Sequence, residues 1–134
     1  MTVIEFLRAR LAEDEQAAKH AVEGPASLAT EWHVDRYRQG SEHHLTVADA
    51  DGVVIAPELG RQADHIARHD PARAAEFVRF VRMMIAIRNG LVADDNECEQ
   101  CDGYRIEIAM YDAIFRDMAK IWRTHPDYQE KWPA

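Results

Sequence analysis

The spacing of apolar residues changes period twice along this 134-residue chain, and this change limits the folds open to it. Before Gly24-Pro25 and after Pro57, apolar side chains recur every three or four residues, which is typical of amphipathic helices. Between residues 31 and 56 they alternate with polar side chains, which is typical of strands. Because the helical spacing covers most of the chain, the sequence predicts an α+β protein that is mainly α.

Residues 2–22 are expected to form the first helix. Thr2 and Glu5 have the spacing of a capping box, in which each side chain accepts a hydrogen bond from the backbone N–H of the other residue. Apolar residues then follow on one helix face, while Arg10 is expected among the charged residues of the opposite face. Gly24-Pro25 ends the helix because both residues break regular structure.

Residues 31–56 predict a small antiparallel sheet. Two β-rich runs flank Asp49-Ala50-Asp51-Gly52, and Asp-Gly in this position favours a hairpin because Gly tolerates the positive φ of such turns. A turn at Gly40-Ser41 would add an earlier strand, so a hairpin and a three-stranded meander are both open. A lone hairpin is marginally stable, so its apolar face is expected to pack on a helix.

Asp70-Pro71 separates two further helices, since Asp is a favourable N-cap and Pro fits the first helical position. Asn89-Gly90 is a suitable C-terminal stop, and Asp102 is the expected cap of the last long helix. The aromatic residues Tyr128 and Trp132 are expected to fold back on the core, and would form a partner-binding patch if they were exposed. The expected elements after the sheet are a short helix at 60–69, a long helix at 71–88, an acidic loop at 91–102, a long helix at 103–123 and a tail at 124–134.

The composition argues against several classes of protein. A length of 134 residues suits one domain, so residues 1–134 are expected to form a single domain with its own core. Sixteen Lys and Arg against 24 Asp and Glu give a net charge of −8, which opposes nucleic-acid binding because phosphates must be neutralised by positive charge. No apolar run has the length of a signal peptide core or membrane helix, so we expect a cytoplasmic location and no membrane partner.

Cys98 and Cys101 have the Cys-x-x-Cys spacing with which two thiolates bind one tetrahedral Zn²⁺. A structural zinc site has four ligands, and His65 and His69 are four residues apart, so that on a helix both imidazoles share one face. The sequence therefore predicts a structural zinc site of Cys98, Cys101, His65 and His69. The alternative is that the cysteines are plain thiols and that the histidines are exposed side chains. A redox role of the thiols is opposed by the acidic residues beside the cysteines, because negative charge disfavours the thiolate form.

No motif of nucleophilic or phosphate-binding catalysis is present, so the sequence favours a non-enzymatic protein that binds another, so far unidentified, protein. An acidic surface is complementary to a basic partner. If that partner binds nucleic acid, the acidic surface would mimic the nucleic acid. The long apolar helix stripes also predict self-association, most simply as a symmetric homodimer. Two alternatives stay open: a small metal-dependent hydrolase with Glu97 or Glu99 as general base, and a zinc-dependent nucleic-acid-binding module whose basic face is Arg73, Arg79, Arg82 and Arg88.

Three segments carry a resemblance to a known family: residues 5–15, residues 63–73, and residues 125–128 with Trp132. The chain resembles the domain of unknown function 6221, a family of small actinobacterial and actinophage proteins, and more distantly the early-region accessory proteins of temperate phages. In the family that the chain resembles, many members have a Cys-x-x-Cys before the last helix, often with a further cysteine. This chain has no third cysteine, so the resemblance leaves histidine to complete a zinc site. The resemblance implies an accessory role in a phage or mobile element and no mechanism.

Overall fold

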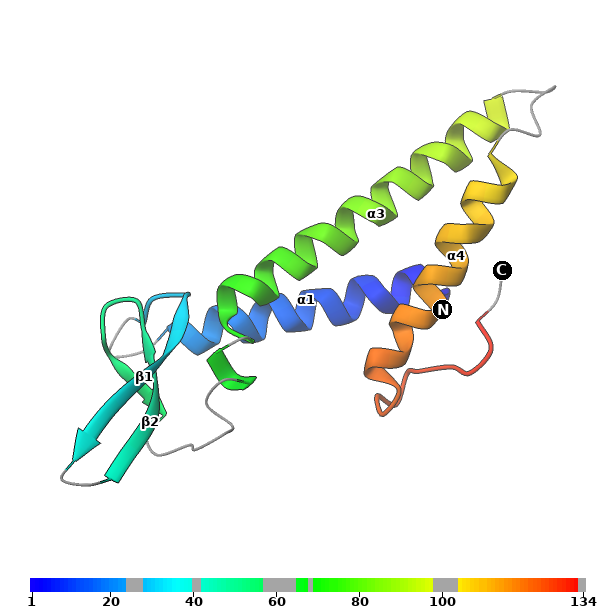
Figure 1. The fold of residues 1–134 in the computed structure, drawn as a ribbon. Coiled ribbons are helices and arrows are strands. Elements are labelled where there is room, and N and C mark those ends of the chain that lie inside the picture. The colour runs from blue at the N-terminus through cyan, green and yellow to red at the C-terminus, as the bar shows by residue number, and fades with distance from the viewer. Residues whose placement is uncertain (24–27, 40–41, 57–64, 68, 98–103, 133–134) are drawn as a thin grey trace. The chain divides into compact units, whose positions relative to one another are not determined.

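The structure is a computed structural model that describes residues 1–23, 28–39, 42–56, 65–67, 69–97 and 104–132 (Figure 1). Long helices and one small antiparallel sheet confirm the mainly α, α+β fold class. By their contacts, the residues group into two compact units, one of Met1–Glu13 with Val78–Ala134 and the other of Asp14–Phe77. The elements are the helices α1 (Val3–Val22), α3 (Pro71–Glu97) and α4 (Arg105–Ala119), the 3₁₀ helix η1 (Lys120–Trp122), and the strands β1 (Trp32–Gln39), β2 (Glu42–Asp49) and β3 (Val54–Ala56).

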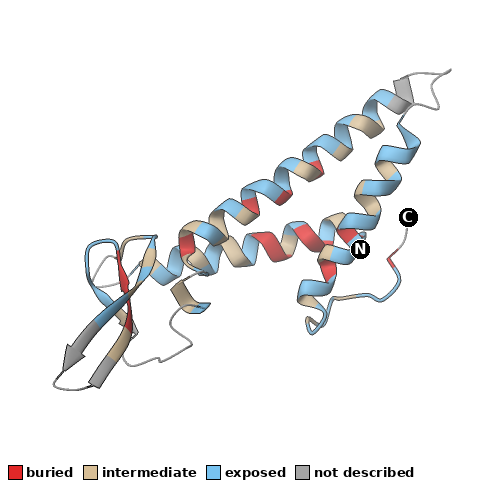
Figure 2. Ribbon diagram, in the orientation of Figure 1, coloured by how far each residue is buried: buried red, intermediate tan, exposed pale blue. Residues whose placement is uncertain are grey.

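The sheet of unit Asp14–Phe77 is a three-stranded antiparallel meander in the order β1-β2-β3. β1 pairs with β2 from Trp32 opposite Asp49 to Gln39 opposite Glu42. Gly52 has a φ of 82°, the positive value expected for the Asp-Gly turn before β3. Val47 and Ala48 on β2 are fully buried, so the sheet supplies the core of this unit (Figure 2).

Asp70 starts α3 and connects it to β1. Its Oδ1 accepts a hydrogen bond from the N–H of Arg73 at 2.7 Å, which is the N-cap geometry expected from the sequence. Its Oδ2 accepts a second hydrogen bond from the N–H of Trp32 at 3.2 Å. Of the short helix expected at 60–69, residues 65–67 are helical, while residues 57–64 and 68 lie outside the described residues. One carboxylate therefore caps the helix and holds the first residue of the sheet.

In the other unit, α1 begins with the expected capping box. The N–H of Thr2 donates to Oε2 of Glu5 at 2.7 Å, and the N–H of Glu5 donates to Oγ1 of Thr2 at 3.2 Å. The hydrogen bond from the Thr2 N–H lowers the pKa of the exposed Glu5 carboxyl. The core of the unit is apolar: Val3, Phe6, Leu7, Leu11, Val78, Val81, Ile85, Phe115, Ala119 and Trp132 are buried (Figure 2).

Two expectations for this unit were wrong. Arg10 is buried rather than on the polar face of α1, because residues of the C-terminal tail cover that face. α3 does not end at Asn89-Gly90 but continues to Glu97, so residues 91–97 are helical and not part of a loop. Gly90 lacks the positive φ of a helix stop, so the helix continues through it at a cost of roughly 1 kcal/mol relative to alanine.

The last helix is shorter than its expected range of 103–123. α4 ends at Ala119 and η1 follows it, and the residue at the N-cap is Tyr104, whose side chain makes no capping hydrogen bond. Asp102, the expected cap, lies with the rest of 98–103 outside the described residues. In the ranges given above, no helix combines the length and the apolar character needed to span a membrane.

Candidate functional site

The two histidines of the expected zinc site lie close together in unit Asp14–Phe77. The ring centroids of His65 and His69 are 4.3 Å apart, and Nδ1 of His69 lies 2.8 Å from the carbonyl oxygen of His65. If Nδ1 donates to this oxygen, Nε2 of His69 keeps a free lone pair for a ligand. Both residues are exposed.

The two cysteines of that site, Cys98 and Cys101, lie outside the described residues. Within the described part of the chain, no group of three or more His, Cys, Asp or Glu side chains is placed to hold a metal ion. The site of Cys98, Cys101, His65 and His69 therefore stays a prediction.

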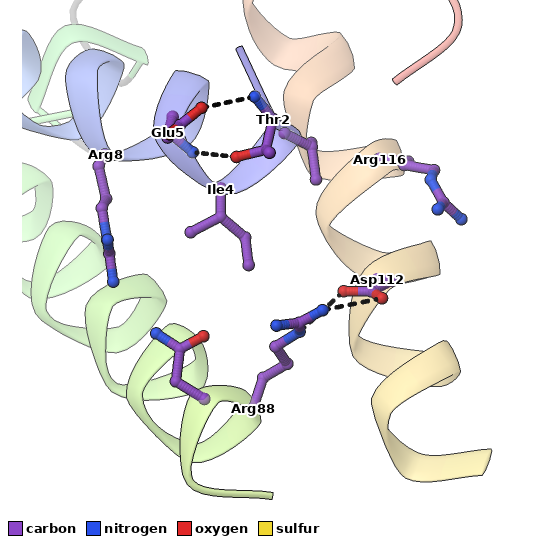
Figure 3. A pocket seen from close by; sticks show the side chains of 9 residues that line it. Thr2, Ile4, Glu5, Arg8, Arg88, Asp112 and Arg116 are labelled. Atoms are coloured by element: carbon purple, nitrogen blue, oxygen red, sulfur yellow. Dashed lines mark hydrogen bonds and ion pairs between the residues drawn. The ribbon is translucent and has the colours of Figure 1, made fainter. Parts of the chain in front are cut away.

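A hollow of about 320 Å³ lies between α1, α3 and α4 in the other unit (Figure 3). On one of its sides Arg88 of α3 binds Asp112 of α4 in a bidentate pair: Nε is 3.0 Å from Oδ1, and Nη2 is 3.2 Å from Oδ2. Arg8 extends from α1 toward α3, and Arg116 extends away from the pair. Because Asp112 neutralises Arg88 and both are half-buried, Arg88 is not available to the basic face expected for nucleic-acid binding.

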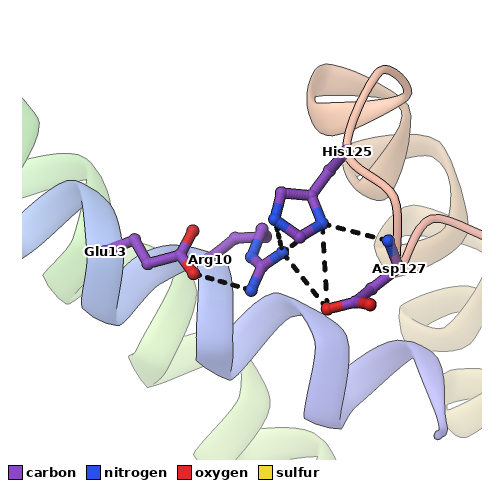
Figure 4. A network of polar contacts seen from close by, with 4 residues as sticks. All are labelled: Arg10, Glu13, His125 and Asp127. Carbon is purple, nitrogen blue, oxygen red and sulfur yellow. Dashed lines mark hydrogen bonds and ion pairs between the residues drawn. The ribbon is translucent and has the colours of Figure 1, made fainter.

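Arg10 is the centre of a polar network in the same unit (Figure 4). Its Nη2 donates to Oε1 of Glu13 at 2.8 Å, its Nη1 contacts the imidazole of His125, and Nη1 lies 3.7 Å from Oδ2 of Asp127. The guanidinium also lies over the ring of Phe6, 5.3 Å from its centroid. Two carboxylates thus compensate one buried cation, and the network connects α1 to the C-terminal tail.

The aromatic residues of the tail pack against Phe6. Its ring centroid lies 4.9 Å from that of Trp132, 6.2 Å from that of Tyr128 and 6.0 Å from that of His125. The expectation that Tyr128 and Trp132 fold back on the core is confirmed. The tail and the Arg10 network therefore stabilise the unit, and these aromatic side chains do not form an exposed partner-binding patch.

The outer face of α4 has three exposed apolar side chains. Ile106 is 74% exposed, Met110 is 60% exposed and Ile114 is 43% exposed. Their spacing of four residues places them in one stripe along the helix, and Phe115 and Ala119 are buried on the other side. Contiguous exposed apolar patches mark interaction surfaces on soluble proteins.

α3 has a second exposed stripe, formed by Phe80, Met83 and Ile87. Neither stripe was among the sequence predictions, because an amphipathic helix is expected to have a single apolar face. The sequence nevertheless contains the pattern of the stripe on α3. Its three apolar residues are separated by three or four positions, and they lie on a different helix face from Val81 and Ile85.

Comparison with known proteins gives a family and nothing more specific. The model of DUF6221, described as a family of unknown function, matches residues 1–134. No curated protein and no solved structure matches the chain significantly. Since the family model covers every residue, the chain belongs to DUF6221, a family of unknown function.

Proposed function

We propose that this protein is a non-enzymatic accessory protein of a phage or mobile element, and that it binds a partner protein through the outer face of α4. The observation that carries the proposal is the exposure of Ile106, Met110 and Ile114 along one face of that helix. Burying these side chains would contribute roughly 25 cal/mol for each Å² of apolar surface removed from water. An apolar helix face of this kind suits recognition by a groove.

The charge of the chain specifies the chemistry of the partner. The net charge is −8, and the exposed Glu107 lies one residue after the first position of the stripe. A partner surface with an apolar centre and a rim of Lys and Arg is complementary to such a protein and would be steered toward it. Surfaces of this composition occur on nucleic-acid-binding proteins. The acidic chain would then occupy such a surface in place of nucleic acid.

The proposal is tested by titrating the protein with a synthetic amphipathic helix of leucine and lysine, followed by fluorescence anisotropy of the labelled peptide. Met110→Asp is expected to weaken binding about tenfold or more, which is about 1.4 kcal/mol. Ala109→Asp is the matched control, since Ala109 is exposed on α4 outside the stripe and receives the same charge. Equal binding by Met110→Asp and the control, or failure of the unmodified protein to bind the peptide, would contradict the proposal.

We also propose that Cys98, Cys101, His65 and His69 bind a structural Zn²⁺. The contact between Nδ1 of His69 and the His65 carbonyl supports this, because zinc-binding histidines commonly donate their second ring nitrogen to a carbonyl oxygen. The 27 residues of α3 lie between His69 and Cys98 in the sequence. A straight helix of this length spans about 40 Å, so one chain would supply all four ligands only if α3 bends, whereas two chains could share the site.

Elemental analysis of the purified protein tests the zinc proposal. We expect close to one zinc per chain, and we expect chelation to remove it and lower the melting temperature. The variant Cys98→Ser should lose the metal. Its melting temperature should fall to the same extent as that of His69→Ala. Purified protein without zinc that also fails to take it up would mean that Cys98 and Cys101 are ordinary thiols.

A further inference from the structure

α3 is apolar on two different faces, and the core covers one of them. Val78, Val81 and Ile85 point into the core and are at most 2% exposed. Phe80 and Met83 are each 52% exposed, and Ile87 is 44% exposed. Their intervals of three and four residues are the spacing with which one helix packs along another. A helix with two apolar faces is expected where a second surface buries the outer one.

The position of the outer stripe suits a second copy of α3. Met83 lies next to the midpoint of Pro71–Glu97, with Phe80 before it and Ile87 after it. A two-fold axis through Met83 would therefore set each stripe against itself, with Phe80 of one chain near Ile87 of the other. Such a self-complementary contact is what a symmetric dimer requires.

The charges along α3 specify the direction of the pairing. Its first half contains three basic residues, Arg73, Arg79 and Arg82, and one acidic residue, Glu76, whereas its last turn contains acidic residues and no basic residue. Negative charge at a helix C-terminus is unfavourable because it adds to the negative end of the helix dipole. An antiparallel copy would bring arginines toward this end, while a parallel copy would bring the acidic ends together. Charge complementarity thus favours the antiparallel arrangement.

We propose that two copies of this protein pair through the outer face of α3, antiparallel about a two-fold axis at Met83. Phe80, Met83 and Ile87 form the apolar centre of the contact, and the exposed residues Arg73 and Asp94 lie near its two ends. The pairing does not depend on the α4 surface or on zinc, so its test is separate from theirs.

Sedimentation equilibrium over a range of concentrations, in the presence of a chelator, tests the pairing. The unmodified chain is expected to dimerise, and Met83→Glu is expected to raise the dissociation constant about tenfold or more, equal to about 1.4 kcal/mol. Asn89→Glu is the matched control, because Asn89 is exposed on a different face of α3 from the stripe. Met110→Asp on α4 should leave the constant unchanged. A chain that is monomeric at every concentration, or a dimer insensitive to Met83→Glu, would overturn the proposal.

A charge exchange tests the direction. Arg73→Asp and Asp94→Arg should each weaken the dimer, and the double variant should restore it, because the exchanged charges again face each other across the contact. Loss of dimer in the double variant, or no effect of either single variant, would rule out the antiparallel pairing. Far-UV circular dichroism of each variant confirms that α3 is still formed.

Discussion

Asp49 at the end of β2 shows how one carboxylate can hold a turn. It is fully buried, and its oxygens accept hydrogen bonds from the N–H groups of Ala29 at 2.8 Å, Val53 at 2.7 Å and Asp51 at 3.1 Å. The hydrogen bond from Ala29 is the largest of the effects that lower the pKa of this carboxyl, and those from Val53 and Asp51 add to it against the cost of burial. The sequence predicted the turn from Asp-Gly, but not the role of Asp49.

Asp49 is expected to make the stability of the protein depend on acidic pH. Since the pKa is lower in the folded state, the carboxylate stabilises the fold above its unfolded value of about 3.9, and this contribution is lost as the pH falls through the folded pKa. Asp49→Asn should lower the melting temperature at pH 7 and reduce its further fall between about pH 5 and pH 2. Thermal melts at several pH values measure this, with the exposed Asp51→Asn as control; identical pH profiles would contradict the assigned role.

At the scale of the element, α3 shows that a stop signal can be overridden. Asn89-Gly90 satisfies the sequence rule for a helix end, yet the backbone at Gly90 is helical and nothing lies within 4 Å of the position of a Cβ. A glycine ends a helix only when it takes a positive φ, which depends on what the following residues contact. Gly52, in contrast, has the positive φ that its turn demands.

The two glycines should therefore respond in opposite directions to alanine. Gly90→Ala is expected to increase the free energy of unfolding by about 1 kcal/mol, because alanine restricts the unfolded chain and fits the helix. Gly52→Ala is expected to decrease it by about 1–2 kcal/mol, because a side chain is strained at this φ. Urea denaturation of both variants measures the difference. A loss of stability in Gly90→Ala would indicate that the helix is not continuous there.

For the whole molecule, the question is whether the two compact units behave as the single domain expected from the sequence. Each has its own buried residues, with Phe6 in one unit and Val47 in the other. Both α1 and α3, however, cross the boundary between the units as continuous helices. Opening one unit alone would break both helices and leave their ends without hydrogen-bond partners. We therefore expect the two units to unfold together.

This expectation is measurable by native-state hydrogen exchange. Phe6→Ala should lower the free energy of unfolding by about 3–5 kcal/mol, and the amides of Val47 and Ala48 should lose as much protection as those of Phe115 and Ala119. Ala12→Ser, at an exposed position of α1, should leave the protection of all four unchanged. If the β2 amides keep their protection in Phe6→Ala, the units are independent domains.

Features that depend on near neighbours in the chain could be predicted from the amino-acid sequence. The capping box of Thr2 and Glu5, the N-cap at Asp70, the hairpin turn at Gly52 and the mainly helical class all follow from interactions over a few residues. The spacing of apolar residues in the sequence also indicates both apolar faces of α3. It could not decide which face would be buried, because Val81 and Phe80 are both apolar and only tertiary packing determines that Val81 is covered and Phe80 is exposed.

The environment of a side chain whose partners are distant in sequence depends on tertiary packing and could not be predicted. Arg10 is buried because His125 and Asp127, more than a hundred residues later, come to lie beside it. Arg88 leaves the expected basic face because Asp112 neutralises it. The exposed stripes on α3 and α4 also depend on tertiary packing, because the core covers only one apolar face of each helix. A charged or apolar side chain fits many environments, and long-range packing selects the one that it occupies.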